Sequence, residues 1–261
     1  MERGREKRAR FLEWLKEEEE RPVIKPRRAR VLGVFSCKGG VGKTTTVVSI
    51  AAHLNRRMKE EILVVDANLM APNLGLHLGE LNPKVTIHDV LSHRVAVEAA
   101  ILKCRGLHAV LGSIAFGEEV HLVDLRGHLE PLMGKYKVIL LDSAPGLGPE
   151  VISAMKACDE ILVVTNPYVP TIASTLKTFT AAERYKIPIV GVVVNRVLGE
   201  PFELSEGEIR KALGWPVITN IPEDPKVREA TAAGVPVVDR TPDSPAAKRF
   251  MKVGDYLIER L

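Results

Sequence analysis

A glycine-rich turn between an apolar run and a helical run constrains this chain more than any other feature of its sequence. Residues 31–36 form a β-like run, and Gly39, Gly40 and Gly42 follow it, just before Lys43 and a helical stretch. Strand, glycine-rich loop and helix in this order are the setting of a phosphate-binding loop. Glycine tolerates the backbone angles and the close approach of phosphate oxygens that converging N–H groups require. The stretch therefore predicts a cradle for a nucleoside triphosphate.

The polar residues of this loop supply the chemistry that a triphosphate needs. Lys43 brings a mobile positive charge for the β- and γ-phosphates, and the hydroxyl of Thr44 can join the ligands of a Mg²⁺ ion. The N-terminus of the next helix adds its dipole. A plain glycine-rich turn with solvated lysines is the alternative, which the flanking strand and helix disfavour. The expected nucleotide contacts are Gly39, Gly40, Val41, Gly42, Lys43, Thr44 and Thr45.

The loop departs from the pattern G-x-x-x-x-G-K-[ST] at its first position, where Cys37 replaces glycine, and a second lysine, Lys38, precedes Lys43 by five residues. With these features it resembles the deviant Walker A motif of the MinD/ParA family of dimerising ATPases, and most closely the archaeal MinD-like members. The resemblance, which covers residues 30–261, implies that ATP and Mg²⁺ are the cofactors. It also implies an ATP-dependent homodimer in which Lys38 reaches the nucleotide of the partner subunit.

Apolar runs recur along the whole chain after the loop. Helical stretches lie between most of them, as a mostly parallel sheet with helices on both faces requires, so we expect a doubly wound α/β fold. The last helix, over residues 244–261, begins with Ser244 as a possible N-cap. Its expected core-facing stripe is Phe250, Val253, Leu257, Ile258 and Leu261. The expected strands are residues 31–36, 62–66, 108–112, 138–142, 161–165, 189–195 and 217–221.

Length and composition favour one soluble domain. The 261 residues are 46% hydrophobic, which is enough to bury a sizeable core. No apolar run approaches the ~18 residues of a membrane-spanning helix, and the N-terminus is too charged for a secretory signal, so a cytoplasmic protein is expected. The three cysteines, Cys37, Cys104 and Cys158, are widely spaced and form no CxxC pair. This spacing argues against a disulfide framework, a zinc site and an iron–sulfur cluster.

The net charge of +4 lies entirely in residues 1–30, which hold 11 Lys/Arg and 7 Glu. We expect these residues to be an extension and linker, followed by an ATPase domain over residues 31–261. A possible helix over residues 2–20 carries an apolar patch beside basic residues, which can contact an anionic membrane or an acidic partner. A helix packed on the core, or a solvated helix, is the alternative. The apolar patch is made of Phe11, Leu12, Trp14 and Leu15.

Two aspartates end expected strands, where ligands bind in doubly wound folds. The resemblance implies an acidic residue at the end of the second strand, which Asp66 matches, and a second acidic residue two positions later that orients the attacking water and the Mg²⁺ ligands. Asn68 stands at that second position, and because an amide cannot accept a proton we expect slow hydrolysis. Asp142 matches the Walker B strand, which implies a metal site formed with Thr44 and Asp66; capping of a turn is the alternative role. The expected catalytic residues are Lys38, Lys43, Asp66, Asn68 and Asp142.

Later strand ends are expected to contact the γ-phosphate and the base. Gly146 follows Asp142 in a segment that resembles switch II, and its amide is expected to approach the γ-phosphate and sense its loss. Asn195 resembles the adenine-contacting asparagine of the family, since an amide both donates and accepts hydrogen bonds. A polar strand end without a ligand is the alternative. The remaining base contacts implied by the resemblance are Arg196, Pro222 and Glu223.

Three functions are compatible with these motifs. The first is an ATPase that cycles between monomer and ATP-bound dimer and recruits a partner protein, still unidentified, to a membrane or polar site. The second is a DNA-partitioning ATPase, which binds DNA through basic surface residues. Residues 31–261 are charge-balanced, with 26 basic and 26 acidic residues, which disfavours DNA as a partner. The third, favoured by Asn68, is an ATP-binding scaffold that hardly hydrolyses.

Overall fold

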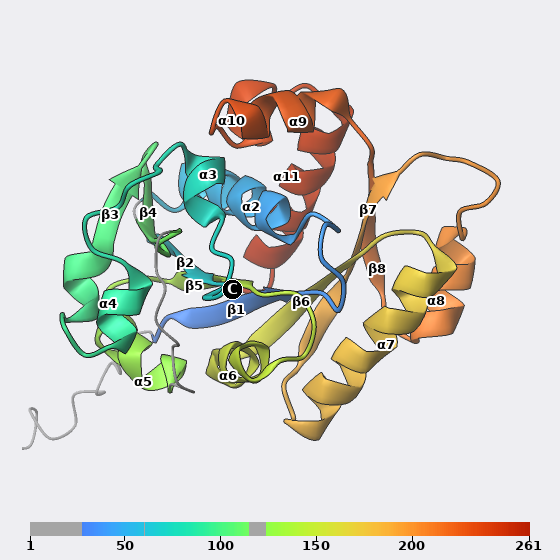
Figure 1. Cartoon of the computed structure of the whole chain (residues 1–261). Coiled ribbons are helices and arrows are strands. Elements are labelled where there is room, and N and C mark those ends of the chain that lie inside the picture. Colours follow the sequence, from blue (N-terminus) through green and yellow to red (C-terminus); the bar gives the residue numbers. More distant parts are fainter. Residues whose placement is uncertain (1–27, 60, 115–123) are drawn as a thin grey trace, which may run out of the picture.

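An eight-stranded sheet runs through the part of the chain that the computed structural model describes, residues 28–59, 61–114 and 124–261 (Figure 1). The strands are β1 (Arg30–Phe35), β2 (Ile62–Ala67), β3 (Ile101–Cys104), β4 (Leu107–Val110), β5 (Val138–Ser143), β6 (Glu160–Thr165), β7 (Ile189–Val197) and β8 (Val217–Pro222). Their order is β3-β4-β2-β5-β1-β6-β7-β8. Every pair is parallel except β3 with β4. The predicted fold class, a mostly parallel doubly wound sheet, is confirmed.

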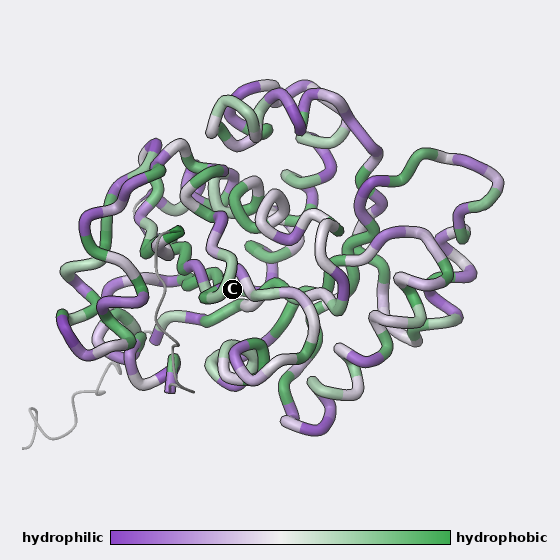
Figure 2. The backbone as a smooth tube through the Cα atoms, in the orientation of Figure 1, coloured by the Kyte–Doolittle hydropathy of each residue, from purple (hydrophilic) through white to green (hydrophobic). Residues whose placement is uncertain are grey.

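All seven expected apolar runs are strands, because a parallel strand covered on both faces is apolar without interruption. Every residue of β2, β5 and β6 is buried. Figure 2 shows the same property as hydrophobic colour along the central strands. The prediction missed β3, an edge strand of which only one of four residues is fully buried. Arg105 and Gly106, at φ 49 and 84, form the tight turn that pairs it with β4.

Two layers of helices enclose the sheet (Figure 1). One layer packs on an apolar core with α2 (Lys43–Arg57), α3 (Leu74–Leu78), α9 (Pro225–Ala232), α10 (Val237–Arg240) and α11 (Pro245–Ile258). The other contains α4 (Ile87–Leu91), α5 (Leu125–Leu129), α6 (Pro149–Ala157), α7 (Val169–Arg184) and α8 (Glu206–Leu213), with the short 3₁₀ turns η1 (Val97–Ala100) and η2 (Glu130–Leu132). None of the described helices is long and apolar enough to cross a bilayer.

The last helix follows the prediction except at its end. Ser244 caps α11, because its hydroxyl accepts the N–H of Ala247 at 3.2 Å. Ile258 is partly buried against the core, but Leu261 is 41% exposed, so its assignment to the stripe is wrong. The helix ends at Ile258, so the residues after it no longer follow the helical repeat that places a side chain on the buried face. The buried stripe is Phe250, Val253 and Leu257.

The first described residues are already tied to the sheet. The N–H of Ala29 donates to the carbonyl of Met133 at 2.7 Å, and that of Arg30 donates to Lys137 at 2.8 Å. The first strand thus begins one residue before the expected domain. The predicted helix over residues 2–20 and most of the linker lie outside the described residues, and the division of the chain at residue 30 stays a prediction.

Candidate nucleotide-binding site

The glycine-rich loop joins β1 to the N-terminus of α2, as its sequence predicted. Gly42 has φ 96, and a Cβ there would lie 2.2 Å from the side-chain nitrogen of Asn195. Glycine is therefore required both for the backbone angle and for the contact behind the loop. Lys43 and Thr44 are buried at the start of α2, whereas Lys38 is exposed.

Two buried aspartates lie side by side at the carboxyl ends of neighbouring strands. Asp66 of β2 is the register partner of Asp142 of β5. The hydroxyl of Thr44 lies 2.6 Å from Oδ2 of Asp142 and 2.8 Å from the side-chain oxygen of Asn73. It has one proton for these two oxygens, and the carboxylate is the stronger acceptor. The structure thus brings together the three residues that the sequence predicted as a metal site.

The electrostatics of this cluster call for a cation. Burial, and then the neighbouring charge of Asp142, raise the pKa of Asp66 to about 8. Burial raises the pKa of Asp142 to about 6, although the Thr44 hydrogen bond and the charge of Lys43 oppose the rise. Burial also lowers the pKa of Lys43, against the attraction of Asp142. In each of the three groups burial outweighs the hydrogen bonds and the opposite charge that it has, so the charged form is disfavoured.

A Mg²⁺ ion fits this arrangement. Oδ1 of Asp142 is buried without a hydrogen-bond partner among the described residues, beside the hydroxyl of Thr44. The described residues contain no cluster of three or more His, Cys, Asp or Glu that could hold a metal by themselves. Mg²⁺ does not require one, because it keeps several waters and takes phosphate oxygens beside one or two protein ligands.

Asn68 stabilises the loop between β2 and α3 through hydrogen bonds. Its side-chain amide donates to the carbonyl of Ala71 at 2.6 Å, and its backbone N–H donates to Asp66 at 3.1 Å. The residue is 6% exposed. A carboxylate here could not donate to Ala71, so the amide holds the loop that leads to α3. The predicted role of Asn68 in positioning water stays a prediction.

The segment after β5, which resembles switch II, contacts the phosphate loop directly. Gly146 has φ 90, and its N–H donates to the carbonyl of Ser36 at 3.2 Å. The hydroxyl of Ser36 in turn donates to the carbonyl of Lys38 at 2.7 Å. The N–H of Gly146, which was predicted to approach the γ-phosphate, thus donates to another part of the protein. It would have to leave Ser36 to contact a ligand, and that contact stays a prediction.

The residues expected near the base lie beside the loop. The side-chain amide of Asn195 donates to the carbonyl of Val41 at 2.8 Å, which supports the loop from behind. Arg196, at φ 61, pairs with Glu223 at 2.8 Å and donates to the carbonyl of Gly40 at 3.3 Å. The last of the four expected residues is Pro222, at the end of β8. Contact with adenine stays a prediction for all of them.

The sequence did not single out two residues that contact the loop threonines. Asn73 stands where an N-cap is expected before α3, yet its side chain caps nothing and reaches Thr44 instead. Nδ1 of His77 lies 3.1 Å from the carbonyl of Asn73, and Nε2 lies 3.4 Å from Oγ1 of Thr45. Burial lowers the pKa of His77. In the neutral ring Nδ1 must donate to the carbonyl, so Nε2 accepts from Thr45.

Comparison with known proteins agrees with this geometry. Residues 27–258 match the family model described as "ParA: NUBPL iron-transfer P-loop NTPase". This chain belongs to the ParA family of P-loop NTPases, and the predicted resemblance to MinD/ParA proteins is confirmed.

Its relatives include archaeal proteins that align over nearly the whole chain. An uncharacterized ATP-binding protein of Methanocaldococcus jannaschii is 33% identical over 233 residues, which are 88% of each chain. The cell division ATPase MinD of Pyrococcus furiosus has a TM-score of 0.85 and 31% identity, and the match covers 89% of this chain and 100% of that one. MinD of Pyrococcus horikoshii, solved with Mg-ADP, has a TM-score of 0.83 and 30% identity over 88% of this chain and 96% of that one.

Proposed function

We propose that this protein is a Mg²⁺-dependent ATPase of the MinD type, which hydrolyses ATP slowly and dimerises when ATP is bound. The observation that carries the proposal is the pair of buried carboxylates, Asp66 and Asp142, beside Lys43 and Thr44 at the start of α2. Such a cluster is unfavourable in an empty site and favourable around a metal–triphosphate. The MinD of Pyrococcus horikoshii, solved with Mg-ADP, supports the same ligands.

The residues divide the work of hydrolysis among them. Lys43 and the N–H groups at the start of α2 bind the phosphates and stabilise charge that develops between the β- and γ-phosphates. Thr44 and Asp142 would hold Mg²⁺, which draws negative charge from the phosphate oxygens when it is bound. Asp66 receives the N–H groups of Asn68 and Leu74, and so orders the loop near the attacking water. Slow turnover follows from the amide at position 68.

Dimerisation assigns a role to the exposed Lys38. Its side chain lies outside the buried cluster, whereas Lys43 is 7% exposed. In the proposed dimer Lys38 would contact the γ-phosphate of the second copy, and charge supplied in this way would make hydrolysis depend on the dimer. The ATP-bound dimer would then recruit a partner protein. Membrane contact through residues 1–30 also remains a proposal, and those residues fall almost entirely outside the described part.

Light scattering and single-turnover hydrolysis test the proposal. We expect a dimer with Mg²⁺ and a non-hydrolysable ATP analogue, and a monomer with ADP. Lys38→Ala should bind ATP but lose hydrolysis, whereas Lys252→Ala, which removes an exposed lysine on α11, should behave as wild type. A dimer that forms equally with ADP, or a Lys38→Ala variant with wild-type turnover, would refute it.

The iron-transfer activity in the description of the family model is not part of the proposal. Cys104 and Cys158 are buried, and only Cys37, in the phosphate loop, is partly exposed. Cluster carriers hold iron through several cysteines that face a common site. The cysteines of this chain therefore do not support that activity.

A further inference from the structure

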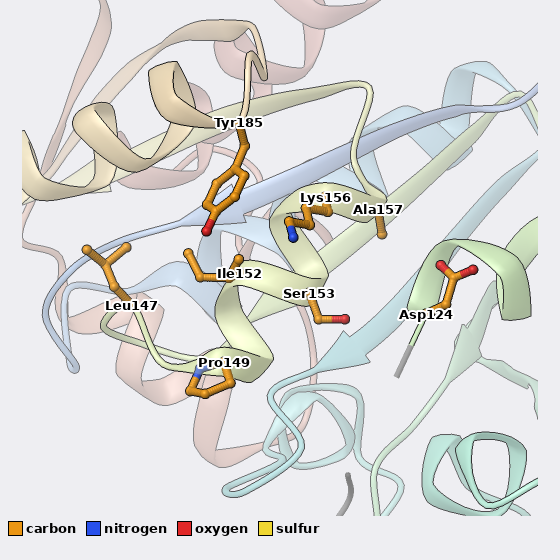
Figure 3. Close-up of a pocket in the computed structure, with 8 residues that line it drawn as sticks. All are labelled: Asp124, Leu147, Pro149, Ile152, Ser153, Lys156, Ala157 and Tyr185. Atoms are coloured by element: carbon orange, nitrogen blue, oxygen red, sulfur yellow. The ribbon is translucent and has the colours of Figure 1, made fainter. Parts of the chain in front are cut away.

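A groove runs along α6, separate from the residues that surround the phosphate loop. Its volume is about 570 Å³. Figure 3 shows the side chains of Leu147, Ile152 and Tyr185 gathered on one side of it, with Asp124 on the other and Lys156 between them. The groove is thus an apolar wall bordered by one cation and one anion, a composition that suits a short amphipathic segment.

One end of the groove adjoins the place where the chain joins the sheet. Arg126 donates to the carbonyl of Ala157, which lines the groove, at 2.6 Å, and to Asp159 at 2.8 Å. The other oxygen of Asp159 accepts the N–H of Val31 at 2.8 Å. Arg28, the first described residue, follows 27 residues of chain, and the strand that it leads into begins next to this groove.

The length of chain before the sheet allows the apolar patch to reach every part of the groove. Arg28 comes thirteen positions after Leu15, and an extended chain of that length spans at most ~43 Å. The nine residues of α6 extend only ~14 Å. Tethering at this distance raises the local concentration of the segment to about the millimolar range, so weak contacts are enough to keep it bound.

The chemistry of the segment matches the lining. Phe11, Leu12, Trp14 and Leu15 offer two aromatic rings and two aliphatic chains, and Lys16 is followed by four glutamates at residues 17–20. On the groove, Nζ of Lys156 lies 4.8 Å from the ring centroid of Tyr185, so the cation borders the apolar wall. Asp124, an exposed residue whose carboxylate accepts the N–H of Gly127 at 3.1 Å, supplies the opposite charge for Lys16. The apolar patch and both signs of charge thus have counterparts in the groove.

We propose that residues 11–20 of this same chain dock in the groove along α6, with the apolar patch against Leu147, Ile152 and Tyr185 and the glutamates toward Lys156. Leu147 directly follows Gly146 of switch II, so the docked segment contacts the part of the protein that the γ-phosphate is expected to move. The docking does not depend on ATP hydrolysis, so an experiment that refutes the docking would leave the proposed ATPase function unaffected.

Tryptophan fluorescence of the full chain tests the docking. The protein has two tryptophans, Trp14 and Trp215, so Trp215→Phe leaves Trp14 as the only reporter. We expect blue-shifted emission and a quenching constant for acrylamide that is several-fold lower than for free tryptophan. Quenching equal to that of free tryptophan would overturn the proposal, as would protection that rises with protein concentration or that requires lipid vesicles, because these identify a second copy or a membrane as the occupant.

Variants in the same Trp215→Phe background locate the contact. Lys156→Glu, an exposed position that tolerates charge, should raise quenching of Trp14, and Ile152→Asp should raise it further. Leu81→Asp is the matched control, because this leucine is 56% exposed away from the groove. Replacing the four glutamates by lysines should restore protection in Lys156→Glu. If all variants quench like the parent, the segment does not lie in this groove.

Discussion

The carboxyl edge of the sheet has two halves that are built differently. In the phosphate half, β2 and β5 pair without a break, and Asp66 and Asp142 are buried at 1% and 0% exposure. In the base half, the pairing of β7 with β8 shifts register twice, and the charges at its end form an exposed ion pair between Arg196 and Glu223. The phosphate half thus has buried charges on strands that pair in continuous register, whereas the base half has an ion pair at the surface on strands whose register shifts.

This difference indicates where ligand binding energy is to be gained. Buried carboxylates that repel each other destabilise the ligand-free protein, and a bound metal–triphosphate would relieve that repulsion. An exposed ion pair contributes only about 0–1 kcal/mol in either state. Substitutions of the buried carboxylates in the phosphate half should therefore change hydrolysis and stability together, whereas those of the ion pair in the base half should change little.

The largest effect is expected for Asp142→Asn. It removes the charge that faces Thr44 and that would hold Mg²⁺, and loss of one such electrostatic contact lowers turnover by ~10²–10³-fold. Single-turnover hydrolysis at saturating ATP measures the change, and equilibrium binding of ADP without Mg²⁺ serves as the control for an intact loop. Turnover within threefold of wild type, on the order of 0.7 kcal/mol in barrier, would show that the carboxylate pair is not the site of catalysis.

Asn68→Asp should raise hydrolysis and lower stability at the same time. A carboxylate at this position can orient water, and a ~10-fold gain corresponds to about 1.4 kcal/mol of barrier. The same change removes the amide that donates to Ala71, which should lower the free energy of unfolding by about 1–3 kcal/mol. Single-turnover kinetics and urea unfolding separate the two effects. A variant that is less stable but no faster would mean that Asn68 stabilises the loop before α3 and does not limit hydrolysis.

A smaller effect is expected in the pH dependence of stability without nucleotide. Both carboxyl groups have a raised pKa, about 8 for Asp66 and about 6 for Asp142, so between pH ~4 and ~8 the folded protein binds more protons than the unfolded chain. Stability should then fall as pH rises through this window. Asp142→Asn should melt several degrees above wild type at pH 8, with a smaller difference at pH 5. Parallel melting curves for the two proteins would contradict the expected repulsion.

The smallest effect is expected for Arg196→Ala. It breaks the exposed pair with Glu223 and the contact with the carbonyl of Gly40, which together should weaken ATP binding by less than ~5-fold, or about 1 kcal/mol. Titration calorimetry measures the change, and Arg228→Ala, a neighbour that lies 3.7 Å from the same glutamate, is the control. A loss of 100-fold or more would erase the contrast between the two halves.

Much of the fold was readable in the sequence, for a physical reason. Central parallel strands are buried on both faces, so β2, β5 and β6 appear as uninterrupted apolar runs, and the glycine and lysine spacing of the phosphate loop is a property of adjacent residues. The edge strand β3, which is only partly buried, has no such run and was missed. The same reasoning identified Ser244 as the N-cap of the last helix, but it wrongly included Leu261 in the buried stripe of that helix.

The sequence by itself determined the phosphate loop, the order of strands and helices, and the presence of carboxylates at strand ends. Only the tertiary structure decided that Asp66 and Asp142 are register partners with raised pKa values, and that Asn195 supports the loop across 154 positions of sequence. It also decided that Asn73 turns away from its cap toward Thr44. These properties depend on burial and on distances between remote segments, which the order of residues along the chain does not express.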